Sequence, residues 1–234
     1  MATSTGIKHR SASLLVAAIA AATLVIVCAA GFVWWRYVPA RDGVYVFGNE
    51  RMAWHVAITN GAVRTLFLEN RVTGARLDVA GEDFAFHIGR ASTIGWAPEL
   101  KKPADQYPPF TVRDGVTITP DHCIAQWLVR GRHTRTLVLY QPDLDLEVRL
   151  VYSAERGRPW LRRRVALRAR GSEPLAIDQA AHHVRWRTDA RATLGGVGQP
   201  VALDATWFLG IEHPRALNTN EAQTIVLSQY PGRI

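Results

Sequence analysis

Apolar and polar residues alternate with a period of two along most of the chain after Gly43. This period places successive side chains on opposite faces of a β-strand, whereas a helix gives a period of 3.6. Many short strands separated by turn residues are typical of a β-sandwich or barrel. We therefore predict an all-β, antiparallel fold. The expected strands cover 54–59, 62–67, 84–88, 115–119, 123–130, 134–140, 144–153, 161–170, 175–187 and 224–229, with a long proline-containing loop at 94–110.

Asn60-Gly61 lies between two of these alternating runs. This dipeptide is a strong signal for a tight hairpin, because both turn residues must adopt a positive φ. We expect one face of the hairpin to be apolar and aromatic. The predicted cross-strand pairs are Ile58 with Val63, Val56 with Thr65 and Trp54 with Phe67. A second turn is expected at 72–74.

The arginine-rich run at 161–170 could be taken for a nucleic-acid patch, but it also alternates as a strand. One predicted face carries Arg162, Arg164, Arg168 and Arg170, and the other carries Leu161, Val165, Leu167 and Ala169. A turn near Arg156-Gly157 would pair Leu146 with Leu167 and Val148 with Val165, and would set Asp145 opposite Arg168. We therefore expect a solvated outer sheet face and no nucleic-acid partner. Arg163 falls on the packed face opposite Leu150 and requires a partner carboxylate.

The segment from Ala12 to Trp35 contains no charged residue and is long enough to span a bilayer. Trp34-Trp35 at its end favours an uncleaved anchor with an aromatic interfacial belt. The alternative is a signal peptide cleaved at 28–30. Both alternatives place the rest of the chain outside the cytoplasm, either on a single-pass anchor or secreted. The expected organisation is a cytoplasmic N-terminus at 1–11, the signal anchor or signal peptide at 12–35, a linker at 36–42 and the sandwich at 43–234.

Composition adds few constraints on chemistry. The net charge is +8, and the only cysteines are Cys28, inside the apolar segment, and Cys123, predicted to be a small core residue. One cysteine in the folded part excludes an intrachain disulfide and a cysteine metal site there. His182 and His183 are adjacent, so on a strand they face opposite ways and cannot chelate together. We predict no catalytic residue, no metal site and no cofactor.

Residues 194–214 combine several glycines with aromatic and ionisable side chains. Trp207, Glu212 and His213 are the predicted sugar-binding residues, because an aromatic face stacks on a sugar and the polar groups bind its hydroxyls. The alternative places Trp207 and Phe208 in the core and Glu212-His213 in an ordinary turn. A His and a Glu could also act as acid and base in aldose mutarotation.

Several motifs in this order resemble bacterial α-galactosidase-like, melibiase-type glycoside hydrolases. They are residues 67–74 (FLENRVTG), 159–163 (PWLRR), 198–201 (GQPV), 207–214 (WFLGIEHP) and 229–232 (QYPG). The resemblance implies the N-terminal β-supersandwich of these enzymes, with a galactose-mutarotase-like shape. In the family this sandwich precedes a (β/α)₈ barrel that carries both catalytic carboxylates.

This chain departs from the family because no barrel follows the sandwich, so we expect the sandwich to be truncated at its C-terminal end. The resulting hypothesis is the non-catalytic, sugar-facing sandwich of an exported glycoside hydrolase. Its expected partners are carbohydrate, the membrane through the N-terminal helix, and a missing catalytic barrel. Two alternatives remain: a stand-alone carbohydrate-binding or mutarotase-like protein, and a structural or interaction module of the cell envelope.

Overall fold

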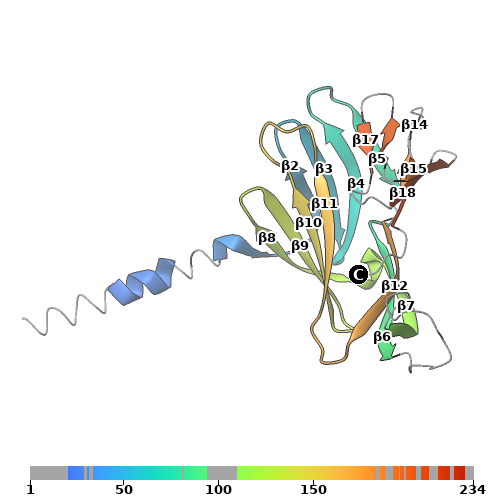
Figure 1. The fold of residues 1–234 in the computed structure, drawn as a ribbon. Coiled ribbons are helices and arrows are strands. Elements are labelled where there is room, and N and C mark those ends of the chain that lie inside the picture. Colours follow the sequence, from blue (N-terminus) through green and yellow to red (C-terminus); the bar gives the residue numbers. More distant parts are fainter. Residues whose placement is uncertain are drawn as a thin grey trace, which may run out of the picture.

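The computed structural model describes residues 21–28, 31, 34–80, 82–93, 110–182, 185–187, 192–194, 196–197, 199–203, 207–210, 216–221 and 224–229. These residues form antiparallel β-sheets almost throughout (Figure 1). The predicted all-β class and antiparallel pairing are therefore confirmed.

Two five-stranded sheets contain most of the described strands. The first has the order β1-β8-β9-β10-β11, with β1 (Tyr37–Pro39), β8 (Ile124–Arg130), β9 (Thr134–Gln141), β10 (Leu146–Ser153) and β11 (Arg162–Ala169). The second has the order β13-β5-β4-β3-β2, with β13 (Arg185–Arg187), β5 (Arg76–Ala80), β4 (Ala62–Asn70), β3 (Met52–Thr59) and β2 (Gly43–Gly48). We call them the first and the second sheet.

Two further sheets and a short 3₁₀ turn complete the described fold. A six-stranded sheet has the order β15-β18-β19-β12-β6-β7, with β15 (Gly196–Val197), β18 (Ala216–Glu221), β19 (Thr224–Gln229), β12 (Leu175–His182), β6 (Ala85–Thr93) and β7 (Phe110–Ile118). A small sheet joins β14 (Ala192–Leu194), β16 (Val201–Leu203) and β17 (Trp207–Leu209). The turn spans Pro120–His122.

One core cluster extends across the sheets, and β10 shows how a strand contributes alternate residues to it. On β10 the residues Leu146, Val148, Leu150 and Tyr152 are all buried. The Tyr152 ring reaches the second sheet, where its centroid lies 4.8 Å from that of Phe47 and 6.0 Å from that of Trp54. The predicted core position of Cys123 is also confirmed, since it is 3% exposed.

The hairpin at Asn60-Gly61 forms as predicted near its turn. Asn60 has φ 51° and Gly61 has φ 79°, and the pairs Ile58–Val63 and Val56–Thr65 are present. The predicted Trp54–Phe67 pair is wrong, because a β-bulge shifts the register between His55 and Val56. Trp54 pairs with Leu68 instead, and Phe67 pairs with His55, whose ring stacks on it at a centroid distance of 4.0 Å.

The hairpin of β10 and β11 is displaced by two residues from the predicted register. Val148 pairs with Leu167 rather than Val165, and Leu146 pairs with Ala169 rather than Leu167. Glu147, not Asp145, lies opposite Arg168, so the predicted Asp145–Arg168 pair is wrong. A shift of two residues keeps every side chain on its face, so Leu146, Val148 and Leu150 are packed as predicted. Two residues depart from the predicted division, because Glu147 is buried and Ala169 is exposed.

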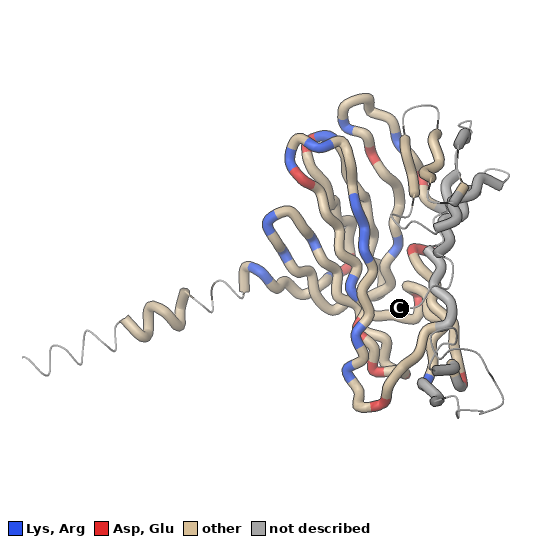
Figure 2. The backbone as a smooth tube through the Cα atoms, in the orientation of Figure 1, with Lys and Arg blue, Asp and Glu red and all other residues tan. Residues whose placement is uncertain are grey.

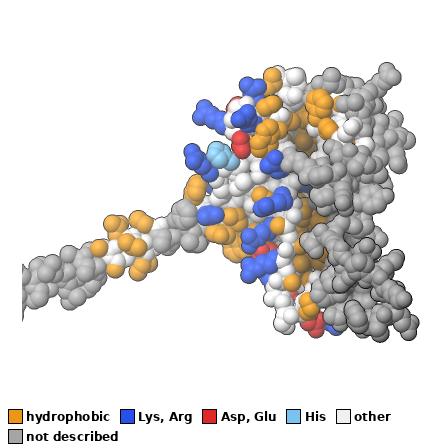
Figure 3. Space-filling view, in the orientation of Figure 1, with side chains coloured by type: hydrophobic (Ala, Val, Ile, Leu, Met, Phe, Trp, Pro, Cys, Tyr) orange, Lys and Arg blue, Asp and Glu red, His pale blue; other side chains and the backbone are white. Residues whose placement is uncertain are grey.

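The four outward arginines of the run at 161–170 are exposed, as predicted: Arg162, Arg164, Arg168 and Arg170. Figure 2 shows basic residues along β11, and Figure 3 shows basic side chains gathered on the face in view. Beneath them Glu147, 5% exposed, binds Arg149 Nε at 2.6 Å and Arg170 Nη2 at 2.6 Å. This carboxylate offsets part of the positive charge of the face.

The N-terminal part is described from residue 21. Residues 21–28 are helical, and Tyr37–Pro39, inside the expected linker, form β1 and pair with β8. Among the described residues, no helix is long and apolar enough to cross a membrane. Residues 12–20 of the expected apolar segment, and residues 94–109 of the expected long loop, lie outside the described part.

Candidate functional site

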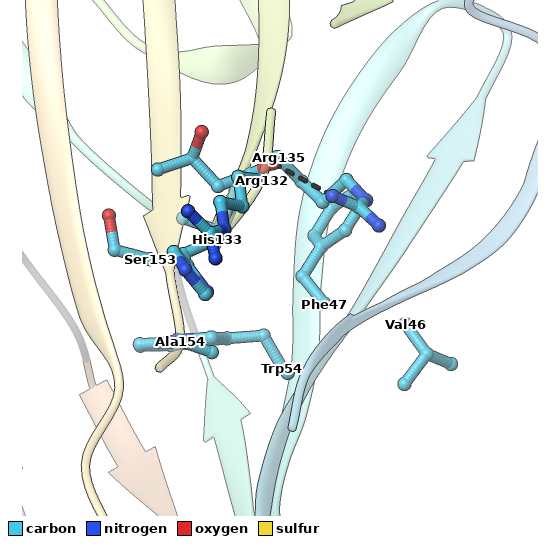
Figure 4. Close-up of a pocket in the computed structure, with 11 residues that line it drawn as sticks. Val46, Phe47, Trp54, Arg132, His133, Arg135, Ser153 and Ala154 are labelled. Carbon is cyan, nitrogen blue, oxygen red and sulfur yellow. Dashed lines mark hydrogen bonds between the residues drawn. The ribbon is translucent and has the colours of Figure 1, made fainter. Parts of the chain in front are cut away.

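A small pocket opens where the ends of the first and second sheets meet (Figure 4). Its volume is about 110 Å³. Four stretches of chain build it: the end of β2, Trp54 on β3, the turn that joins β8 to β9 together with the start of β9, and the end of β10. The lining residues are Val46, Phe47, Gly48, Trp54, Arg132, His133, Thr134, Arg135, Tyr152, Ser153 and Ala154.

The turn between β8 and β9 carries the basic side chains of this pocket. It is closed by a hydrogen bond from the Gly131 N–H to the Thr134 carbonyl oxygen at 2.9 Å. Arg135 Nη1 donates to the Gly131 carbonyl at 2.8 Å and to the Thr134 carbonyl at 2.9 Å. Figure 4 marks the bond to Thr134. The Ala154 N–H donates to the His133 carbonyl at 3.1 Å and ties the turn to the end of β10. The arginine is therefore held in place before any ligand arrives.

Aromatic rings form the apolar wall of the pocket. Phe47 is 3% exposed, Trp54 is 7% exposed and Tyr152 is 2% exposed. In the described part of the chain, Trp54 Nε1 and Tyr152 Oη are fully buried. The Tyr152 hydroxyl lies next to Thr65 and Arg163. The rings, rather than these polar atoms, are therefore what the wall offers to a ligand.

Behind this wall lies a buried ion pair. Arg163 Nη1 donates to Asp83 Oδ1, and Arg163 Nη2 donates to the Asp83 carbonyl oxygen at 2.8 Å. The side chains of Arg163 and Asp83 are 7% and 1% exposed. Asp83 also accepts from the Thr65 N–H at 2.7 Å and from the Thr65 hydroxyl. The carboxylate that the sequence required for Arg163 is therefore Asp83.

Tyr152 lies between the pocket and this ion pair. Burial raises the pKa of the Tyr152 phenol far above its usual value, and the negative charge of Asp83 raises it further, while Arg163 opposes the shift. The phenol is therefore neutral at physiological pH and can donate a hydrogen bond. The Arg163 guanidinium carbon also lies 5.5 Å from the centroid of the Trp54 ring, within the range of a cation–π contact.

The residues predicted to bind sugar are only partly described. Trp207 on β17 is 6% exposed and belongs to the core, while the next residue, Phe208, is 66% exposed. Glu212 and His213 lie outside the described residues, so their role stays a prediction. The structure does not show these three side chains together.

Comparisons with protein-family models, curated proteins and solved structures found no match to this chain. Within the described residues, no group of three or more His, Cys, Asp or Glu side chains could hold a metal ion. We therefore infer the chemistry of this chain from the pocket and the buried ion pair. Both contain hydrogen-bonding and charged groups, and the pocket lining contains no carboxylate that could act as a general acid or nucleophile.

The pocket could not be predicted from the sequence, because its walls come from segments far apart in the chain. Arg132-His133 follows Gly131 in a turn, and basic residues at a turn are usually only solvated. The pairing of β8 with β9 was the one usable signal, because it predicts which residues occupy that turn.

Proposed function

We propose that this chain is a non-catalytic, sugar-binding sandwich that works outside the cytoplasm, with the galactose-mutarotase-like supersandwich as its finer fold. The antiparallel sheets are compatible with this fold, and the ordered motifs at 67–74, 159–163 and 207–214 support it by resemblance. The N-terminal segment serves as anchor or signal in this proposal.

The pocket is the observation that carries the proposal. Small-molecule sites are concave, largely apolar or aromatic, and carry a few fixed polar groups that set orientation. Phe47, Trp54 and Tyr152 supply the aromatic wall, and Arg135 and the hydroxyls of Thr134 and Ser153 supply polar groups. A volume of about 110 Å³ lies well below the roughly 300 Å³ at which drug-sized pockets begin. It therefore suits one end of a sugar rather than a whole oligosaccharide.

The absence of a carboxylate from the pocket lining supports a role in binding rather than in hydrolysis. Glycoside hydrolysis requires two carboxyl groups at about 5–10 Å from each other across the scissile bond. Trp207, Glu212 and His213 remain the predicted contacts to sugar or to a barrel, at a second place on the sandwich.

Calorimetric titration of the full chain in detergent with galactose, glucose and galacturonate tests the proposal. We expect saturable binding of at least one sugar, and its loss in Ala154→Trp, which fills the pocket. Ala169→Trp is the matched control, since Ala169 is exposed on β11 away from the pocket lining, and it should bind as the parent does.

Two results would oppose the proposal. Turnover of an aryl α-galactoside by the purified chain would refute the non-catalytic part. No binding of any sugar, with Ala154→Trp indistinguishable from the parent, would refute the sugar-binding part and leave the interaction module as the better hypothesis.

A further inference from the structure

The ionisable groups that line the pocket point to the charge of its ligand. Arg132, His133 and Arg135 are basic, Tyr152 is a neutral phenol, and no Asp or Glu lines the pocket. In the described part of the chain, none of the three basic side chains forms an ion pair. The described side chains therefore do not neutralise the positive charge at this site, whereas Arg163 behind the wall pairs with Asp83.

The hydrogen bonds of Arg135 fix the position of its guanidinium group in the pocket. Both of its hydrogen bonds to backbone carbonyls use the same nitrogen, Nη1. Its Nε and Nη2 are left without a partner within the described residues. A guanidinium fixed at one nitrogen is pre-organised to bind a carboxylate or phosphate through the others. Less side-chain entropy is then lost on binding.

The neutral polar groups of the lining are also suited to an acceptor. Thr134 and Ser153 carry hydroxyls that can donate to an acceptor. The Arg135 guanidinium can only donate. An incoming oxyanion carries several acceptor lone pairs and no donor, so it complements this set, whereas a cation or a donor-rich ligand does not.

Size limits what part of the ligand can enter. A cavity of about 110 Å³ exceeds the share of roughly 30 Å³ that one water takes in the liquid, so it has room for a carboxylate or phosphate group together with the adjoining carbon atoms. The rest of the ligand would remain outside, next to the exposed side chains of Arg132 and His133.

We propose that the pocket between β2, the β8–β9 turn and the end of β10 binds the oxyanion of an acidic sugar, with Arg135 as the fixed contact and Arg132 and His133 as the outer contacts. This inference rests on the proposed function for the sugar part of the ligand. The oxyanion part rests on the pocket alone. The outer arginines of β11 are a weaker candidate, because Glu147 already pairs with two basic side chains on that face.

The test is calorimetric titration of the full chain at low and at physiological salt with four ligands: galacturonate, galactose 6-phosphate, galactose and acetate. We expect at least one acidic sugar to bind tenfold or more tightly than galactose. The tighter of the two acidic sugars identifies carboxylate or phosphate as the natural group. The affinity should fall as salt rises, because part of it is electrostatic.

Variants then locate the site. Arg132→Gln removes an exposed charge from the lining and should weaken binding of the acidic sugar several-fold, with little effect on galactose. Arg168→Gln is the matched control, since it removes the same charge from an exposed position on β11 outside the pocket. Arg135→Gln should weaken binding further, and a thermal melt shows whether the variant is still folded. Ala154→Trp should abolish binding without changing any charge.

The outcomes separate this inference from the proposed function. Equal binding of galactose and the acidic sugars, unchanged in Arg132→Gln, overturns the inference and leaves sugar binding intact. Arg132-dependent binding of acetate with no preference for a sugar ring supports the oxyanion pocket and overturns the sugar-binding proposal. No binding of any of the four ligands overturns both.

Discussion

The guanidinium of Arg163 on β11 and the carboxylate of Asp83, 80 positions apart in the sequence, form an ion pair inside the core. Thr65 on β4 donates to the same carboxylate. The pair therefore joins the edge of the first sheet to the second sheet and to the segment between β5 and β6. A buried pair of this kind depends on both partners, because either charge alone would be left desolvated.

Removal of one partner should be strongly destabilising. We expect Arg163→Met to lower the free energy of unfolding by about 3–5 kcal/mol, because Asp83 is left buried and unpaired. Asp83→Asn should cost a similar amount. The double variant should be destabilised by less than the sum of the two single variants. Urea denaturation of the four proteins measures this, and additive single effects would show that the two side chains do not depend on each other.

The turn at Asn60-Gly61 should be sensitive to a side chain at Gly61. The φ of Gly61 is +79°, and a Cβ added to Gly61 would lie 3.3 Å from Ile124 Cγ2. A left-handed conformation costs a residue with a Cβ about 1–2 kcal/mol, and crowding of a packed site adds about 1 kcal/mol or more. Gly74→Ala is the matched control, since its φ is +73° and nothing lies within 4 Å of the added Cβ. Thermal melts should place Gly61→Ala below Gly74→Ala, and the opposite order would contradict this packing.

Glu147 should contribute to stability in a pH-dependent way. Burial raises the pKa of Glu147, but hydrogen bonds and charges from Arg170 and Arg149 outweigh this, so the pKa lies below its usual 4.5. The folded state therefore favours the charged form. Its contribution is complete above about pH 4.5 and is lost as the pH falls through the lowered pKa.

Glu147→Gln tests this. The variant should be less stable than the parent by about 1–2 kcal/mol at pH 7, and the difference should shrink as the pH falls below 4.5. Glu173→Gln is the control, because Glu173 and its partner Arg90 are 64% and 66% exposed and such surface pairs contribute little. A difference for Glu147→Gln that stays constant down to pH 3 would rule out the carboxylate charge as its cause.

Cys123 should not react with thiol reagents in the folded protein. It is 3% exposed, and burial raises the pKa of its thiol to about 12. In a Cys28→Ser variant, an aromatic disulfide reagent should detect no thiol in buffer at pH 8 and one thiol in urea. The reciprocal Cys123→Ser variant retains Cys28, so it measures the reaction of that thiol separately. Rapid reaction of Cys123 in buffer would show that this part of the core opens easily.

The faces of the strands could be predicted from the sequence better than their registers. Alternation placed Arg163 inward and Arg164 outward correctly, since only the parity of a position matters. The two-residue displacement of β10 against β11 was not predictable from parity, because it depends on how the loop at 154–161 closes. The bulge that pairs Trp54 with Leu68 was missed for a related reason: nothing in the alternation marks one extra residue in β4.

The candidate site was less predictable than the fold. The sequence indicated that Arg163 needs a partner carboxylate. It did not indicate which one, because only tertiary packing brings Asp83 next to Arg163. The pocket likewise depends on Phe47, Arg135 and Tyr152 meeting from three strands. Residue type alone does not decide the role of an aromatic side chain. Trp207 is an example, because an indole can stack on a sugar or pack in a core, and in the structure it is 6% exposed.

β1 pairs with β8 directly after the helical residues 34–36. A peptidase that cut the chain at 28–30 would leave Tyr37–Pro39 attached to their sheet. The first sheet would then be the same with and without the residues before the cut, so a cleavage at this place would leave the pocket beside β2 and β10 unchanged.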